Sequence, residues 1–187
     1  MSPAASGPKL IVITGGPGSG KTTLVEALGE RGYPTVPEAA IQVIAELNEE
    51  LGLEQQKRWR LADPVAFQRR VFARQLEHER GIDGALGELV FLDRGLLDGL
   101  GYLRHFGQEL PPDLEEAARV VRYDAVFFLD TLTDFVQREG TGRMSGRTDS
   151  LAIGERILEV YRERGYDVVR VPELSVADRM AWVLGRV

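Results

Sequence analysis

The chain has 187 residues, 43% of them hydrophobic and 28% charged, with a formal net charge of −6. This balance predicts one globular domain and disfavours general binding to nucleic acid, which needs excess Lys and Arg. The absence of cysteine excludes disulfides and cysteine-based zinc sites, and two histidines disfavour a His-rich metal site. No apolar run reaches the roughly 18–20 residues of a membrane span. We therefore expect a soluble, cytoplasmic protein without a membrane partner, with residues 1–8 as a flexible N-terminal tail.

Strand-like and helix-like segments alternate along the rest of the chain. The apolar segments 9–14, 35–37, 89–93, 125–130 and 167–171 have the composition of strands buried on both faces, the second being the weakest. Helical periodicity occupies 22–31, 39–51, 64–84, 96–106, 112–123, 150–164 and 175–184. This alternation predicts an α/β fold with a parallel sheet, in which residues 9–187 form a single domain.

A glycine-rich segment between the first strand and the first helix matches the phosphate-loop pattern G-x-x-x-x-G-K-[ST] in full. Glycines allow backbone N–H groups to approach phosphate oxygens, and the helix directs its positive N-terminal dipole at the same anion. We expect the Lys21 ammonium to reach the β- and γ-phosphates of ATP, with GTP possible, and the Thr22 hydroxyl to bind Mg²⁺. The predicted nucleotide-binding residues are Gly15, Gly16, Pro17, Gly18, Ser19, Gly20, Lys21, Thr22 and Thr23.

Acidic residues follow several predicted strands, and the carboxyl ends of parallel strands form one edge of a sheet. Asp93 ends the third strand and is expected to hold Mg²⁺ directly or through water, with Arg94 directed toward a substrate or the transferring phosphoryl group. Glu38 follows the second strand and could accept a proton from a substrate hydroxyl. Capping of the next helix is the alternative for Asp93 and for Glu38. Asp130 is a further candidate for contact with Mg²⁺-bound water, or a turn residue.

Arginines and glycines are concentrated between the fourth strand and the next helix. We expect residues 137–149 to form a mobile lid whose arginines neutralise phosphate charge, Arg143 and Arg147 being favoured over Arg138. A solvated basic loop is the alternative. On the long helix, Gln68 could read a base or amide edge and Arg69 or Arg70 could bind an anion, although an exposed helix face is nearly as consistent with the pattern.

These motifs together resemble the AAA-28 type ATP-binding family of kinase-like proteins, which is similar to ribosylnicotinamide, deoxynucleoside and thymidylate kinases. The resemblance rests on five segments, 10–23, 36–40, 67–70, 91–95 and 127–130. It implies a three-layer α/β/α P-loop NTPase with strand order 2-3-1-4-5 and an arginine-containing lid. By the same resemblance, Glu38 would be the base, Asp93 and Arg94 the acid–arginine pair, and Phe67 and Gln68 part of the acceptor site.

The function that we expect is a small-molecule kinase that moves the γ-phosphoryl group of ATP–Mg²⁺ to a nucleoside- or nucleotide-like acceptor. Lys21, Glu38, Asp93, Arg94, Arg143 and Arg147 would be catalytic, and Thr22 with Asp93 would hold the metal. Glu38, Gln68, Arg69 and Arg94 would bind the acceptor. The alternatives are a regulatory switch with slow ATP or GTP hydrolysis, and phosphorylation of a nucleic-acid 5′-hydroxyl. The acidic charge opposes the latter, so nucleic acid is not an expected partner, whereas a homodimer is possible.

Overall fold

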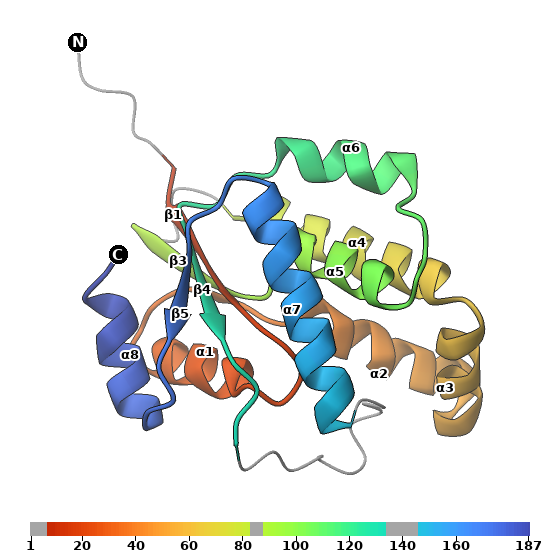
Figure 1. The fold of residues 1–187 in the computed structure, drawn as a ribbon, viewed down its shortest axis with the longest axis horizontal. Coiled ribbons are helices and arrows are strands. Elements are labelled where there is room, and N and C mark those ends of the chain that lie inside the picture. The colour runs from red at the N-terminus through yellow and green to blue at the C-terminus, as the bar shows by residue number, and fades with distance from the viewer. Residues whose placement is uncertain (1–6, 83–87, 134–145) are drawn as a thin grey trace.

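Thirteen helices and strands occur in the computed structural model, which describes residues 7–82, 88–133 and 146–187 (Figure 1). The strands are β1 (Lys9–Thr14), β2 (Thr35–Val36), β3 (Leu89–Asp93), β4 (Ala125–Leu129) and β5 (Val168–Val171). The helices are α1 (Lys21–Glu30), α2 (Ala39–Leu51), α3 (Leu53–Ala62), α4 (Pro64–Arg80), α5 (Leu96–His105), α6 (Pro112–Val120), α7 (Arg147–Glu163) and α8 (Val176–Leu184).

The five strands form one parallel sheet in the order β2-β3-β1-β4-β5. This confirms the expected α/β class and strand order. In the register between β1 and β3, Ile13 lies beside Asp93. The phosphate-loop segment therefore leaves β1 next to the acidic end of β3, which brings the two principal motifs of the sequence together.

Alternate side chains of the strands enter two separate cores, one on each face of the sheet. Val12, Leu92 and Val126 pack on one face against α4, α5, α6 and α7, whereas Ile13 and Phe127 pack on the other face against α1 and α8. Strands covered on both faces need continuous apolar runs, which is why these segments lack strict alternation. The three-layer α/β/α arrangement is visible in Figure 1, where α1 and α8 lie side by side.

The predicted boundaries differ from the observed ones mainly at helix ends. Helix α4 ends at Arg80 rather than at 84, because the chain leaves the helix at Gly81. Helix α6 ends at Val120 rather than at 123, because Val121 is already extended on the way into β4. Helix α7 begins at Arg147 rather than at 150, so the last part of the predicted lid belongs to a helix.

Helix α3 was not predicted from the sequence. Gly52 separates it from α2 with a φ of 78°, a left-handed conformation that favours glycine. The α3 sequence is strongly polar and has weak amphipathic periodicity, so its apolar pattern does not mark it as a helix. Packing against α2 and α4 holds it in place. Together α2 and α3 extend away from the sheet (Figure 1).

The described helices do not include one that is both long and apolar enough to cross a membrane.

A glycine sets how closely α5 and α7 pack beneath the sheet. A Cβ atom placed on Gly101 would lie 2.7 Å from the Cα and 2.9 Å from the backbone nitrogen of Ile157. We predict that Gly101→Ala lowers the free energy of unfolding by about 1–3 kcal/mol, because backbone atoms cannot move aside as a side chain can. Urea denaturation measures this change.

Gly29→Ala in α1 is the matched control. Its added Cβ would meet only the Thr35 side chain, at 3.6 Å. The higher helix propensity of alanine should leave this variant as stable as the wild type, or up to about 1 kcal/mol more stable. Equal losses in the two variants would contradict the proposed packing constraint.

Candidate active site

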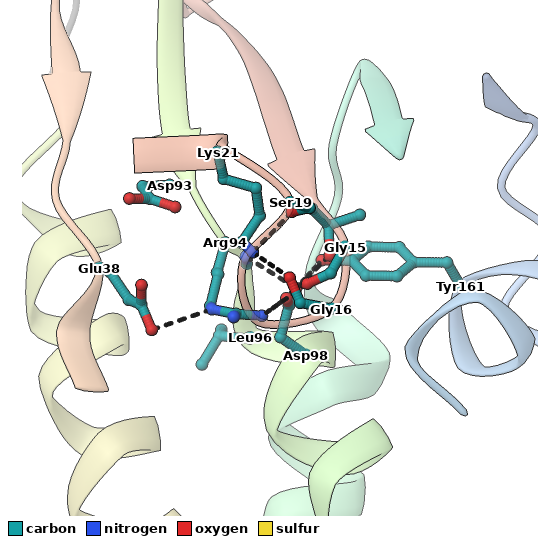
Figure 2. A network of polar contacts seen from close by, with 12 residues as sticks. Gly15, Gly16, Ser19, Lys21, Glu38, Asp93, Arg94, Leu96, Asp98 and Tyr161 are labelled. Carbon is teal, nitrogen blue, oxygen red and sulfur yellow. Dashed lines mark hydrogen bonds and ion pairs between the residues drawn. The ribbon is translucent and has the colours of Figure 1, made fainter. Parts of the chain in front are cut away.

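The phosphate-loop segment follows β1 and ends in the first turn of α1. Gly20, with a φ of 83°, is the residue before the helix and supplies no side chain to cap its N–H groups. Those N–H groups are therefore available to an anion. The Lys21 ammonium curls back over the loop and donates to the Gly16 carbonyl at 2.7 Å and to the Ser19 hydroxyl at 3.1 Å (Figure 2).

Two of the loop glycines are also required by packing within the protein. A Cβ on Gly15, whose φ is 141°, would lie 2.1 Å from the Leu129 carbonyl oxygen. A Cβ on Gly16 would lie 2.2 Å from the Ser150 carbonyl oxygen. The start of the loop is thus fixed between β4 and α7, and the same residues that allow close approach to phosphate allow this close approach to backbone.

Thr22 and Asp93, the two residues expected to hold Mg²⁺, lie together. The Thr22 hydroxyl donates to Asp93 Oδ2 at 2.7 Å. The other carboxylate oxygen, Oδ1, is buried and accepts no hydrogen bond from the described residues. A threonine hydroxyl beside a buried carboxylate oxygen fits Mg²⁺, which binds few protein ligands and keeps the rest for water and phosphate. The side chain does not cap α5, the alternative considered from the sequence.

Asp93 has an unusual electrostatic environment. Burial, followed by repulsion from Glu38, raises the pKa of Asp93 from 3.8 to about 6, against the opposing effect of Lys21. Ionising a buried carboxylate on its own costs free energy, and a nearby cation stabilises the ionised form. The raised pKa is therefore consistent with a metal ligand in the loaded site.

Arg94 lies beneath the phosphate loop and connects it to two carboxylates. Its guanidinium donates to the Gly15 carbonyl at 3.1 Å and to Asp98 Oδ1 at 2.9 Å, and its Nε lies 3.1 Å from Glu38 Oε1 (Figure 2). Burial alone would lower the pKa of Arg94, but Tyr102 and these carboxylates hold the pKa well above its ordinary value. Among the described non-glycine residues only Arg94 has a positive φ, 75°, a strained conformation typical of functional sites.

Asp98 is a residue that the sequence did not single out. Besides Arg94, it accepts hydrogen bonds from the hydroxyls of Thr14 and Tyr161, each at 2.8 Å, and from the Gly95 backbone at 3.2 Å. The carboxylate therefore ties β1 and α7 to the turn after β3. No local pattern marked this pair, because Arg94 lies before the start of α5 in a left-handed conformation, so the helical spacing rule does not apply to it.

Glu38 faces Arg94 rather than the helix that it precedes. It is 6% exposed, and it makes no capping hydrogen bond to α2. The capping alternative is thus not what the structure shows. Its carboxylate lies at the boundary between the phosphate loop and the helical wall of the cavity described next.

A cavity of about 700 Å³ extends from the phosphate loop between α2, α3, α4 and α5. The lining includes Lys21 and Thr22 of the phosphate-loop segment, and it also includes apolar side chains such as Ile44 and Phe72. Gln68 lines this cavity and is 4% exposed, and its suggested contact with a base or amide edge stays a prediction. A cavity whose lining is chemically mixed in this way can hold a nucleotide and a second molecule.

Other predicted residues lie elsewhere. Arg69 forms an exposed ion pair with Asp113 and Arg70 one with Glu50, so the structure does not bring either arginine into the cavity. Asp130 forms an ion pair with Arg170 of β5, so its observed role is structural.

The predicted lid is described only in part. Arg138 and Arg143 lie outside the described residues. Arg147 is exposed in the first turn of α7. Hydrogen bonds from Thr133 lower the pKa of Glu173, and Arg179 and Arg147 add smaller effects in the same direction. The suggestion that these arginines reach phosphate stays a prediction.

A further basic contact to the loop, besides those of Lys21 and Arg94, comes from the C-terminal helix and was missed from the sequence. Arg179 of α8 is 5% exposed and donates to the Ser19 carbonyl at 3.1 Å. A Cβ placed on Gly20 would lie 3.2 Å from Nη1 of this guanidinium. The residue lies 160 positions from its partner, so no local pattern could have revealed it.

The chain has the fold of P-loop proteins, and solved structures of nucleoside and nucleotide kinases share this fold. Solved structures with this fold include the deoxyadenosine kinase of M. mycoides with bound dATP, at 16% identity and a TM-score of 0.67 over 95% of this chain and 98% of that one. The thymidylate kinase of Ehrlichia chaffeensis has 16% identity and a TM-score of 0.63, over 96% and 98%. The NadR protein in complex with NR has 19% identity and a TM-score of 0.61, over 88% of this chain and 43% of that one.

The chain belongs to the AAA_28 family, described as an AAA domain, whose model matches residues 10–179. This confirms the resemblance seen in the sequence motifs. A search of curated proteins finds no match.

We predict that Asp93→Asn stabilises the unliganded protein at pH 8. The folded-state pKa of Asp93 lies above the unfolded value, so the folded state holds more protons between pH 3.8 and about 6, and stability from this group falls as pH rises through that window. Asparagine removes the cost of ionising a buried carboxyl group. We therefore expect the free energy of unfolding to rise by about 1–3 kcal/mol at pH 8, and this increase to vanish near pH 4. Urea denaturation at several pH values measures it.

Asp167→Asn, at an exposed position, is the control and should leave the free energy of unfolding within about 0.5 kcal/mol of the wild type. A loss of stability at pH 8 in Asp93→Asn would contradict the assigned environment.

We predict that Asp98→Asn destabilises the fold by about 3–5 kcal/mol, because one amide cannot accept all the donors directed at the carboxylate and Arg94 loses a buried partner. Tyr161→Phe removes a single donor and should cost only about 1 kcal/mol. Denaturant unfolding of the two variants checks the order, and a loss as large for Tyr161→Phe would show that the single hydrogen bond from the Tyr161 hydroxyl, rather than the combined Asp98 network, dominates.

Proposed function

We propose that this protein is a kinase that transfers the γ-phosphoryl group of ATP, bound with Mg²⁺, to a hydroxyl group of a nucleoside-like acceptor. One observation carries the proposal: the lining of a single cavity contains residues of the phosphate loop, the Glu38 carboxylate and many apolar side chains. A protein that only bound and hydrolysed a nucleotide would not need so extended an apolar lining.

On the triphosphate side, the loop N–H groups and the Lys21 ammonium would bind the phosphates. Lys21 is preorganised on the loop by its two hydrogen bonds and would exchange them for phosphate oxygens. Thr22 and Asp93 would hold Mg²⁺, which supplies neutralisation of charge on the β- and γ-phosphates. Phosphoryl transfer depends mainly on such positioning and neutralisation.

On the acceptor side, Glu38 would orient the hydroxyl. As the hydroxyl oxygen bonds to the γ-phosphorus, the bond from phosphorus to the β,γ-bridging oxygen breaks and ADP leaves. The hydroxyl proton passes to Glu38, whose carboxylate Arg94 holds in place at 3.1 Å. Asp98 in turn fixes Arg94, so the base is positioned by a buried, fully hydrogen-bonded carboxylate.

The experiment incubates the protein with ATP and Mg²⁺, adds nucleosides, nucleotides and ribosyl-pyridines one at a time, and measures ADP release. We expect at least one acceptor to stimulate release strongly. Lys21→Ala should reduce the stimulated rate by about 10²–10³-fold. Slow release that every acceptor leaves unchanged would contradict the kinase and favour the regulatory switch.

We predict that Glu38→Gln lowers kcat by about 10²–10⁴-fold and leaves ATP affinity within a few-fold, because glutamine keeps the shape and cannot take the proton. Stimulated ADP release and calorimetric titration with ATP measure the two quantities. Glu49→Gln, exposed on α2, the helix that Glu38 precedes, is the matched control and should behave as the wild type. Unchanged turnover in Glu38→Gln would show that Glu38 is not the base.

A further inference from the structure

Three consecutive carbonyl oxygens of the phosphate loop accept hydrogen bonds from segments outside the loop. The Pro17 carbonyl accepts from the Thr131 hydroxyl at 3.5 Å, and the Gly18 carbonyl accepts from the Leu132 N–H at 3.3 Å. The Ser19 carbonyl accepts at 3.1 Å from a guanidinium of α8. This third bond is the shortest and has a charged donor, and bonds from charged donors are about twice as strong as neutral ones. The guanidinium is therefore the strongest of the three restraints on the loop.

The same three bonds decide where the N–H groups of the loop point. In a planar trans peptide, the C=O and the N–H that follows it point in opposite directions. Because the three carbonyls are directed toward their partners, the N–H groups of Gly18, Ser19 and Gly20 are directed away from those partners. Gly18 and Gly20 are among the residues that line the cavity. Successive N–H groups on one side of a loop form a concave site for an anion.

The guanidinium that holds Ser19 belongs to Arg179, whose charge the described residues balance only in part. Arg179 is 5% exposed, and its buried Nε has no hydrogen-bond partner among those residues. Burial lowers the pKa of Arg179, and Glu173 opposes this shift only partly. The Glu173 side chain is itself exposed, and its carboxylate accepts hydrogen bonds from the N–H and the hydroxyl of Thr133. A buried cation in this state is stabilised when an anion comes near it.

We propose that Arg179 is a positioning residue for the nucleotide, which aligns the Ser19–Gly20 peptide and supplies, from behind the loop, a positive charge that a bound polyphosphate neutralises. The inference rests on the triphosphate side of the proposed function and does not depend on the acceptor. The described lining of the cavity does not include Arg179, so the residue acts through the loop. The peptide transmits the effect, because its C=O bonds to the cation while its N–H faces the anion, and hydrogen bonds in a chain polarise one another.

The test measures the affinity of the protein for Mg²⁺–ATP by calorimetric titration, and for inorganic tripolyphosphate by competition with ATP. We expect Arg179→Met to weaken the binding of both ligands by about 10–100-fold, because a charge-assisted hydrogen bond and a buried cation are lost together. Tripolyphosphate has no base or ribose, so equal losses locate the effect at the phosphates. Arg186→Met removes an exposed cation just after α8 and is the matched control. Because solvent and salt screen that charge, its affinities should stay within about two-fold of the wild type.

Two further variants separate the charge of Arg179 from its packing. Arg179→Lys keeps the charge and a donor, and its affinity for both ligands should stay within about five-fold of the wild type. Arg179→Gln keeps a donor without the charge and should lose nearly as much affinity as Arg179→Met. Circular dichroism at the temperature of the titration verifies that each variant is folded. The comparison of lysine with glutamine decides the question even if Arg179→Met does not fold.

Several results would overturn the role of Arg179. They are full affinity in folded Arg179→Gln, a loss in Arg179→Lys as large as that in Arg179→Gln, a loss for ATP without one for tripolyphosphate, and a failure of tripolyphosphate to compete with ATP on the wild type. An absence of ATP binding by the wild type would overturn this role and the kinase together.

The two proposals can also fail separately. If the affinity for ATP depends on Arg179 as expected while no acceptor stimulates ADP release, the positioning role stands and the kinase proposal fails. Acceptor-dependent ADP release together with ATP binding that is indifferent to Arg179 would leave the kinase proposal intact and remove the positioning role.

Discussion

The guanidinium of Arg94 lies buried between the carboxylates of Glu38 and Asp98 and donates to the carbonyl of Gly15. Through Asp98 the same network reaches Thr14 at the end of β1 and Tyr161 of α7. Removing one partner of a buried ion pair leaves an uncompensated charge, which costs far more than the intact pair contributes. The positions of the phosphate loop, of the α2 start and of α7 are therefore coupled.

That coupling means that the candidate catalytic groups also have structural roles at this site. Arg94 adopts a left-handed backbone conformation that is unfavourable for a residue with a Cβ, and the surrounding hydrogen bonds hold it there. Gln75 adds one more, from its amide to the Arg94 carbonyl at 3.3 Å. In return the site gains a fixed cation directly below the loop, where developing negative charge on phosphate would be stabilised without rearrangement.

Local sequence patterns predicted the elements that depend mainly on residues close to one another in the sequence. The glycine-rich loop has a required residue type at almost every position, so the loop, the preceding strand and the following helix could be located together. The pairing of Thr22 with Asp93 was also predictable, because strand ends of a parallel sheet share an edge. Helix α3 was not, because its apolar pattern is weak and its position depends on packing against α2 and α4. Arg179 was missed as well, because its partner Ser19 is distant in the sequence.

The sequence by itself determined the α/β class, the strand order through the family resemblance, and the phosphate loop with its neighbouring acid at Asp93. It left open whether Glu38 caps the helix that follows it, and whether Arg69 or Arg70 lies near the candidate site. Only the tertiary structure decided these points, by turning Glu38 to Arg94 and pairing both helical arginines on the surface, and it placed Arg179 against the Ser19 carbonyl. The physical reason is that the partner of each of these side chains belongs to another helix or strand, or to the loop. Burial, rather than local propensity, then decides which charged groups must pair with one another.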